Sequence, residues 1–224
     1  YIHADTLKMI TDSLGREMKA YPNARFYRVD FQGVCDTMHY VSKDSTIYMK
    51  KDPVIWNEDN QVLGDRIDVL LNDSTIEKAF VRNYALSIQK RPIEDQYNQL
   101  KGRNMTVSFI DGEMRHVLVD GSAESLYYLM EKDSTIIGIN KTESPFLSMD
   151  IVDNKLEKLK LWSSTKGVTT PLSQTTPEDK TLKGFVWLDY LRSINKDDIF
   201  RKVERKASEN IIPPRRFVRE EDFD

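Results

Sequence analysis

Residues 102–119, GRNMTVSFIDGEMRHVLV, have the pattern of a complete β-hairpin. Apolar residues of the first half alternate with polar ones, which is typical of a strand with one buried face: Met105, Val107 and Phe109. Asp111 and Gly112 follow, and both residue types tolerate the positive φ that a tight hairpin turn requires. The stretch therefore predicts an outgoing strand, a tight turn and a return strand.

The hairpin pattern is repeated along the chain. It occurs again as GDRIDVLLNDSTIEKAFV at 64–81 and as SPFLSMDIVDNKLEKLKL at 144–161. A fourth copy, CDTMHYVSKDSTIYM, covers 35–49, and a degraded fifth copy, ADTLKMITDSL, covers 4–14. Even turn spacing of this kind favours an all-β fold built from repeated antiparallel hairpins.

Each return strand carries the same irregularity. The first two apolar residues after the turn lie three positions apart instead of two, in the pairs Ile76 and Ala79, Met114 and Val117, and Leu156 and Leu159. A β-bulge or a corner in the strand produces such a change of spacing. Because it recurs at one place in each hairpin, we expect it to bend the sheet along a line. The prediction is a folded-over sheet with two opposing apolar inner faces.

Composition excludes several classes of protein. The 224 residues are 39% hydrophobic, which supports a sizeable core. The 33 basic and 36 acidic residues are interspersed, giving a net charge of −3, whereas a nucleic-acid-binding protein gathers basic residues on one face. Cys35 is the single cysteine, so an internal disulfide is excluded, and its apolar neighbours favour a small buried residue.

The start of the chain suggests a fragment of an exported protein. No apolar run is long enough to span a membrane, and the N-terminal residues lack the pattern of a signal peptide. Tyr1 begins within the repeat pattern. We therefore expect an excised part of a longer protein with its export signal upstream.

The composition changes after residue 162, where we place the end of a repeat domain covering 1–162. The segment 163–180 is rich in Ser, Thr and Pro and is interpreted as an extended surface connection. In the C-terminal part, 181–224, the stretch TLKGFVWLDYLRSIN has apolar residues all around a helical wheel, so a short buried helix and a strand closing the sandwich both remain open. Beyond Lys196, the spacing of four residues predicts one amphipathic helix: Ile199, Phe200, Val203 and Ala207. The last residues, 211–224, are expected to be extended or disordered.

The sequence offers little support for catalysis. The three histidines are far apart and match no metal-ligand spacing: His3, His39 and His116. The acid pairs, Glu94-Asp95 and Asp197-Asp198, lie in polar segments typical of a solvated surface. The Asp-Ser-Thr triplets starting at 44, 73 and 133 coincide with predicted turns, where capping is the expected role. We expect no catalytic residue, no metal and no cofactor, and hence no enzyme.

Methionine is frequent in the predicted hairpins. Six of the eight methionines lie in the repeat array, and several occupy its apolar positions. This flexible side chain suits a surface that accepts a variable apolar partner, but it also fills ordinary β cores. Both interpretations remain open.

The repeats resemble those of the OstA-like family, which includes relatives of LptA, the periplasmic bridge protein of lipopolysaccharide transport. The resemblance is carried by residues 64–88, GDRIDVLLNDSTIEKAFVRNYALSI, and 101–128, KGRNMTVSFIDGEMRHVLVDGSAESLYY, and extends over about residues 1–162. The leading Gly-Asp, the apolar alternation and the acidic turn match best in one unit, at Gly64, Asp65, Ile67, Val69, Asp73 and Ile76. Arg103 follows the next glycine, and Ser144 replaces the third, so these later units match less well.

The resemblance implies a β-taco or β-jellyroll with an apolar slot for the acyl chains of lipopolysaccharide. It also implies a periplasmic location, association with the outer membrane, and other envelope transport proteins as partners. Exposed end strands would allow protomers to stack head to tail into a longer conduit. No nucleic acid is expected as a partner.

The in-phase apolar residues of the outgoing strands are our candidates for the slot: Met38, Tyr40, Ile67, Val69, Met105, Val107, Phe109, Leu147, Met149 and Ile151. Residues of the return strands are expected to oppose them: Val117, Val119, Leu159 and Leu161. Two other classes remain as alternatives. A structural repeat domain of the cell envelope would have a filled core, and a glycan-binding or glycan-processing protein would gather acids and aromatics, including Trp56, Trp162 and Trp187, in a cleft.

Overall fold

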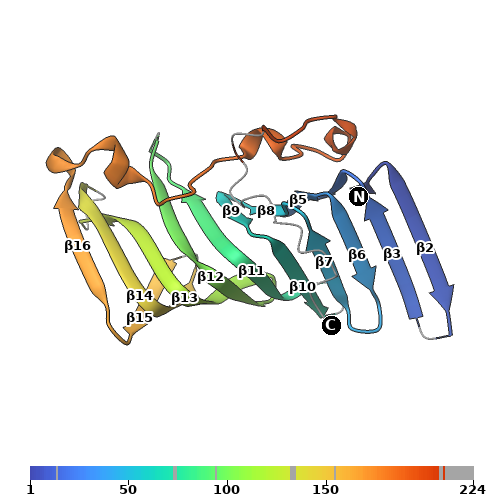
Figure 1. Cartoon of the computed structure of the whole chain (residues 1–224), viewed down its shortest axis with the longest axis horizontal. Helices are drawn as coiled ribbons and strands as arrows, with labels where there is room; N and C mark the ends of the chain where they lie inside the picture. Colours follow the sequence, from blue (N-terminus) through green and yellow to red (C-terminus); the bar gives the residue numbers. More distant parts are fainter. Residues whose placement is uncertain are drawn as a thin grey trace, which may run out of the picture.

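The computed structural model describes residues 1–13, 15–72, 75–93, 95–131, 135–153, 155–206 and 209. These residues form one sixteen-stranded sheet in which all the strand pairs are antiparallel. No α-helix occurs among them, and no helix there is long and apolar enough to cross a membrane. The all-β fold of antiparallel hairpins is confirmed. Figure 1 shows the strands side by side from β2 at one end to β16 at the other.

The strands have the following bounds: β1 Ile2–His3, β2 Thr6–Asp12, β3 Gly15–Tyr21, β4 Ala24–Arg28, β5 Phe31–Cys35, β6 Thr37–Val41, β7 Thr46–Lys50, β8 Val54–Asn57, β9 Asn60–Leu63, β10 Arg66–Asn72, β11 Thr75–Lys90, β12 Tyr97–Ile110, β13 Glu113–Met130, β14 Ile136–Val152, β15 Lys155–Trp162 and β16 Lys166–Pro171.

Four long strands fold the sheet into two layers. The first half of β11 pairs with β10, whereas its second half pairs with β9, and β12, β13 and β14 continue this division. We call layer A the part that contains β2, β3, β6, β7, β10, β15 and the adjoining halves of β11 to β14. Layer B contains β1, β4, β5, β8, β9, β16 and the other halves. The long strands therefore join the layers along one side, as in a folded sheet.

The line of folding lies where the long strands lose their pairing. Register shifts occur between Arg82 and Ala85 and again where β12 and β13 cross the same line. Asn83 and Tyr84 have φ values of 55° and 57°, in the left-handed region, and unpaired residues in this conformation turn the strand. Successive corners of this kind bend the sheet.

The three predicted bulges are present, but they do not make the fold line. Each inserts one residue near a hairpin turn, at Glu77, Arg115 and Glu157. Because the bulge absorbs the extra residue, the apolar residues on both sides of it stay on one face. The expectation that these bulges bend the whole sheet is wrong, since the bend lies farther along the strands.

Hairpin turns follow the predicted chemistry where the structure describes them. Asp111 and Gly112 have φ values of 54° and 82°, as a tight turn between β12 and β13 requires. Asp153 is also left-handed, with φ 49°. The predicted turn acids Asp73 and Asp133, like Glu94 of the acid pair, lie outside the described residues.

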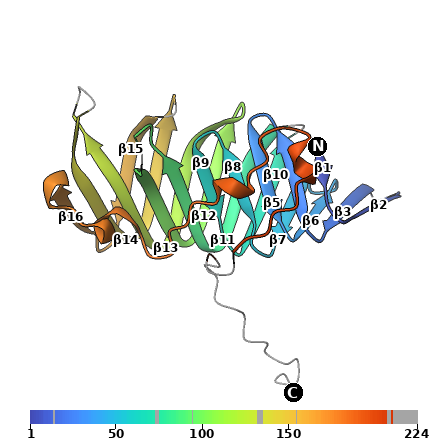
Figure 2. The same ribbon diagram turned by 90° about the horizontal axis from the view of Figure 1, so that it is seen from above.

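The C-terminal part departs most from expectation. The sheet continues into the segment 163–180, because β16 pairs with β14. Residues 172–206, which we call the strap, then cross the outer face of layer B from β14 to β1 and β4 (Figure 2). The strap contains four short 3-10 turns: η1 Leu172–Gln174, η2 Pro177–Lys180, η3 Asp189–Leu191 and η4 Asp198–Phe200.

The strap forms neither the helix nor the closing strand expected for 181–195, and the amphipathic helix expected beyond Lys196 is wrong for the described residues. Ala207 and 211–224 lie outside them. Several apolar side chains of the strap, including Phe185, Leu188 and Leu191, pack on one sheet face, and polar side chains of that sheet bind its backbone. The backbone N–H and C=O groups of this extended segment can therefore find hydrogen-bond partners without regular secondary structure.

Candidate ligand-binding cavity

The inner face of layer A carries two continuous rows of mainly apolar side chains, formed by residues paired across successive strands. The first row consists of Leu7, Ala20, Met38, Met49, Ile67, Val81, Met105, Val119, Leu147 and Leu161. The second row consists of Met9, Met18, Tyr40, Ile47, Val69, Ala79, Val107, Val117, Met149 and Leu159. A shorter third group lies next to the turns and contains Leu71, Ile76, Phe109, Met114, Ile151 and Leu156.

All fourteen candidates for the slot lie on this one face, with Val119 and Leu161 in the first row. Eight of them line a cavity between the layers: Met105, Val107, Phe109, Val117, Leu147, Met149, Ile151 and Leu159. Four others lie in the part of the same face nearer β2: Met38, Tyr40, Ile67 and Val69. Val117 pairs directly with Val107, and Leu159 with Met149, so the return-strand residues lie beside the outgoing ones. The expectation that the return-strand residues lie opposite the outgoing-strand residues is wrong, because both strands of each hairpin belong to layer A at these positions.

The cavity has a volume of about 790 Å³ and lies between layers A and B at the half of the sheet nearer β15 and β16. Its layer A wall is apolar, and Val107 and Leu147 at its base are buried. Phe31 and Ile55 of layer B line its N-terminal end. A space of this shape with one continuous apolar wall is suited to hydrocarbon chains.

The layer B wall of the cavity is different in character. Its inward positions carry mostly hydroxyl and amide groups: Ser87, Gln89, Asn98, Ser125, Tyr127 and Asn140. Leu100, Leu129 and Val62, which pairs with Ser87, are apolar residues among them. The predicted pair of opposing apolar faces therefore holds for only part of the interior.

The interior nearer the N-terminus is filled. Phe26 and Phe31 stack with their ring centroids 5.3 Å apart, and Met38 and Met49 are buried in the same cluster. Cys35 lies there too, and its burial raises the pKa of its thiol to about 12. The prediction of a buried, unpaired cysteine is confirmed. Methionine thus serves as core filler in this half, whereas Met105 and Met149 face the cavity.

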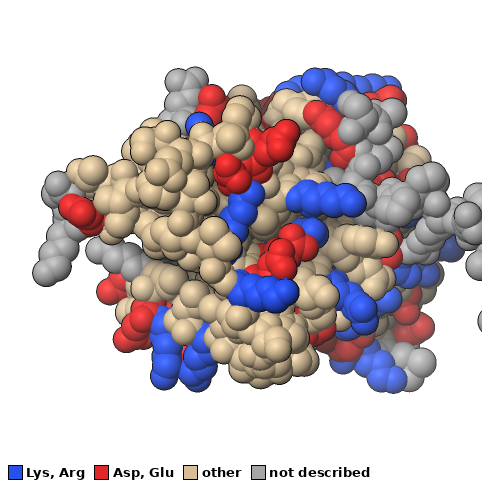
Figure 3. Space-filling view, turned by 60° about the vertical axis from the view of Figure 1, so that its left-hand side comes forward, with Lys and Arg blue, Asp and Glu red and all other residues tan. Residues whose placement is uncertain are grey.

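The cavity reaches the side of the molecule opposite the fold line. Its lining includes the β8–β9 turn, with Glu58 and Asp59, and the end of β11, with Lys90 and Arg91. Two acidic and two basic residues therefore lie at this rim. Figure 3, in which the β16 end comes forward, also shows basic and acidic side chains interspersed among neutral ones.

Buried amides on the outer face of layer B hold the strap. Gln99 donates from Nε2 to the Lys180 carbonyl at 2.8 Å and accepts at Oε1 from the Leu182 amide at 2.7 Å. Gln61 makes the same pair of bonds, to the Val186 carbonyl at 2.8 Å and from the Leu188 amide at 2.7 Å. Each glutamine therefore pairs with the strap as a neighbouring strand would.

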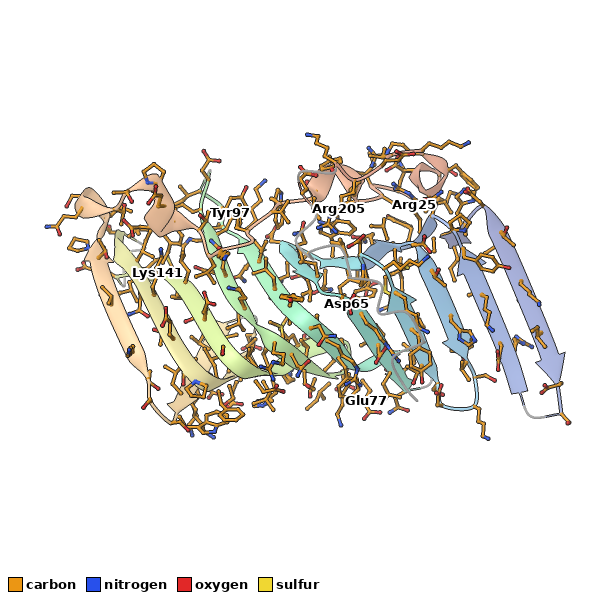
Figure 4. All side chains as sticks on the ribbon, in the orientation of Figure 1. Arg25, Asp65, Glu77, Tyr97, Lys141 and Arg205 are labelled. Carbon is orange, nitrogen blue, oxygen red and sulfur yellow. The ribbon has the colours of Figure 1, made fainter. Side chains whose placement is uncertain are left out.

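Two further positions extend these contacts along the strap. Lys141 donates to the Glu178 carbonyl at 3.2 Å, and Arg25 donates to the Leu191 carbonyl at 3.1 Å. Figure 4 shows the two residues at well-separated places along layer B, with Arg25 next to the strap. Gln61 and Gln99 occupy equivalent places in the motif Asn-Gln-x-x-Gly, which could have drawn attention to them in the sequence.

The outer face of layer A carries charged pairs. Asp68 is buried and accepts from Arg66 Nε at 2.5 Å and Arg82 Nε at 2.8 Å. His116 lies 2.6 Å from a carboxylate oxygen of Asp150, and this contact lowers the pKa of that exposed carboxyl. Within the described ranges, no group of three His, Cys, Asp or Glu residues is placed to hold a metal ion.

The Asp-Ser-Thr triplet that the structure describes completely has the expected capping role. Asp44 accepts from the Thr46 amide at 3.1 Å and from the Tyr48 hydroxyl at 2.5 Å. The residues that would form the other two triplets are only partly described.

Comparison with solved structures finds chains of similar fold. The fold is similar to the crystal structure of LptH, the LptA homologous periplasmic component of the lipopolysaccharide transport device from Pseudomonas aeruginosa, with a TM-score of 0.48 and 12% sequence identity. The similarity covers 64% of this chain and 100% of LptH. No protein-family model matches the sequence, and no curated protein matches it.

Proposed function

We propose that this protein is a periplasmic lipid-binding conduit or carrier that holds acyl chains of lipopolysaccharide, or of a related acylated lipid, between its two layers. The observation that carries the proposal is the cavity of about 790 Å³ whose layer A wall is formed by continuous apolar rows. Each methylene transferred from water into such a space contributes about 0.8 kcal/mol. Acyl chains can therefore be held without a specific polar contact and without any chemistry on the lipid.

The choice of lipopolysaccharide and of the periplasm rests on the resemblance of the repeats to the OstA-like family. Other envelope transport proteins are its proposed partners. The alternative of a structural repeat domain requires a filled core, which the interior has only in the half nearer the N-terminus.

A glycan-binding function has less support. Trp56 is fully buried under the strap and donates from Nε1 to Gln61, so its ring offers no stacking surface. Trp187 packs near Tyr97 on the outer face of layer B, whereas Trp162 stacks on Phe146 in layer A. The three tryptophans are thus not gathered in one cleft.

A test uses two substitutions in neighbouring residues of β12. Val107→Asp places a carboxylate on the apolar wall, whereas Thr106→Asp places one on the outer face. Each protein is titrated with a fluorescent fatty acid after circular dichroism has shown that it retains β structure. The proposal predicts saturable binding by the wild type and by Thr106→Asp, and loss of at least tenfold in affinity for Val107→Asp. Equal affinity of a folded Val107→Asp protein would contradict the assignment of the cavity.

The end strands provide the proposed route to head-to-tail stacking. The rows of layer A terminate at Leu7 and Met9 of β2, which are 55% and 64% exposed, and at Leu159 of β15, which is 43% exposed. Pairing of β15 with β2 of a second copy would continue both rows and cover these side chains. Light scattering over a range of concentrations should show association that the double substitution Leu7→Asp/Met9→Asp abolishes. A wild-type protein that stays monomeric at every concentration would rule the stacking out.

A further inference from the structure

The polar wall of the cavity is not explained by acyl chains alone. Hydrocarbon needs only apolar surroundings, yet layer B turns hydroxyl and amide groups toward layer A across the cavity. The side chains concerned come from four consecutive strands: Ser87, Gln89, Asn98, Ser125, Tyr127 and Asn140.

Four of these side chains have hydrogen-bonding capacity to spare, whereas both amide atoms of Asn98 and of Asn140 already have partners. The hydroxyls of Ser87, Ser125 and Tyr127 make no hydrogen bond to any other residue that the structure describes. Asn98 donates from Nδ2 to Gln89 Oε1 at 3.0 Å, which leaves the amide nitrogen of Gln89 free to donate. Donors and acceptors therefore line this wall without protein partners.

The two faces of layer B use their amides differently. On the outer face of the same layer, the buried amides of Gln61 and Gln99 are fully used in binding the strap. At the N-terminal end of the inner face, Phe31 and Ile55 take the place of the polar residues. The alternation of the strands thus supplies strap-binding amides outside, where the Tyr128 hydroxyl is buried without a partner, apolar groups at one inner end, and polar groups with spare capacity beside the open space.

Covering these groups with a bare hydrocarbon chain would remove them from water without replacing their hydrogen bonds. A buried polar group left unsatisfied in this way is destabilising, whereas an oxygen atom of the ligand would restore the bond. A lipid that suits both walls therefore presents methylene groups to layer A and oxygen atoms to layer B.

We propose that the cavity selects lipids whose acyl chains bear hydroxyl, ester or amide groups, with the methylenes on layer A and the oxygens on layer B. Ser125 and Tyr127 are the specificity-determining residues, because both project their hydroxyls from β13 at the centre of the polar wall. This inference rests on the proposed lipid-binding function and defines the class of lipid more narrowly.

The test compares two ligands that differ by one oxygen: hexadecanoic acid and hexadecanoic acid with a hydroxyl on its third carbon. Their affinities are measured by competition against a fluorescent fatty acid. Wild-type protein should bind the hydroxylated ligand about fivefold more tightly, as one additional net hydrogen bond of ~1 kcal/mol provides.

Two variants locate the source of this preference. In Ser125→Ala/Tyr127→Phe, which removes two hydroxyls and little volume, the affinity ratio should fall to about one while hexadecanoic acid binds at least as tightly as before. The control Thr106→Val, which removes a hydroxyl from the outer face of layer A, should keep the wild-type ratio.

Each outcome separates this inference from the function on which it rests. Equal affinity of the wild type for both fatty acids, or an unchanged preference in Ser125→Ala/Tyr127→Phe, would overturn the selectivity and leave lipid binding in place. Failure of the wild type to bind either fatty acid, or the fluorescent one, would overturn both.

Discussion

The contact between Gln61 and the strap gives a prediction that can be worked out from the structure. Gln61 is completely buried, and its side chain makes three hydrogen bonds: to the Val186 carbonyl, from the Leu188 amide and from Trp56 Nε1 at 3.2 Å. Gln61→Ala removes all three. Because Leu188 and Trp56 are also fully buried, two donors are left without a partner in the closed strap.

The expected cost is about 3 kcal/mol, since each unsatisfied buried donor costs roughly 1–3 kcal/mol. If this cost falls on the attachment of the strap, the population of the opened strap rises roughly a hundredfold. The reporter is the Leu191 amide, which donates to the Leu188 carbonyl at 2.9 Å and keeps this acceptor in the variant. Its hydrogen-exchange rate under native conditions should increase by the same factor.

Gln89→Ala is the matched control. It is the same substitution on the adjoining strand, but Gln89 is exposed and faces the cavity, so its effect on Leu191 exchange should stay within about 0.5 kcal/mol. Unchanged protection of Leu191 in Gln61→Ala would refute the reasoning. It would mean that the apolar contacts of the strap, and not the glutamine bonds, hold it on layer B.

Other substitutions and conditions test the rest of the account. Burial raises the pKa of the Cys35 thiol to about 12. The stability linked to this shift is complete below the unfolded pKa of about 8.5 and is lost as the pH rises toward 12. A thiol reagent at pH 8 should therefore react slowly with the native protein and rapidly with the protein unfolded in urea. Met38→Ala, in the filled half, should lower the free energy of unfolding by about 3 kcal/mol, whereas Met149→Ala, beside the cavity, should cost less than about 1.5 kcal/mol; similar urea midpoints would contradict the difference in packing. Asp68→Asn should lower the free energy of unfolding by about 1–2 kcal/mol, a small value because the two arginine partners of Asp68 are partly exposed, and the loss should be smaller in high salt. A loss of stability that does not depend on salt would argue against the ion pairs.

The hairpin array was predictable because it depends on local patterns. Alternation placed Met105 and Val107 on one face, Asp111 and Gly112 fixed a turn, and the change in apolar spacing located three bulges, all of which the structure contains. These signals act within a single hairpin, so a sequence reading can recover them.

The line of folding was not predictable in the same way. Asn83 and Tyr84 adopt the left-handed conformation without a glycine, so no residue type marks the corner on β11. On β13, Gly121 and Ser122 make the corresponding corner with φ values of 74° and 61°, which shows that different residues serve the same geometry. The sequence pattern therefore led us to assign to the bulges a bend of the sheet that the corners make.

The division of the interior also depends on contacts between distant segments. The inward residues of β13 beyond its corner, such as Ser125 and Tyr127, gave no apolar signal and were not selected as site residues. The strap was missed because its apolar residues follow no regular period, and its backbone is satisfied by Gln61 and Gln99 from far away in the sequence. Such partners become visible only once the sheet is folded.

The central claim is that the cavity holds acyl lipid, and native mass spectrometry with lipid extraction tests it most directly. Protein purified from a lipopolysaccharide-producing host should carry additional mass that extraction identifies as acylated lipid. Met149→Trp, which fills the cavity without adding charge, should lack this mass. A wild-type spectrum that shows only the protein, and remains unchanged after incubation with lipopolysaccharide, would contradict the claim.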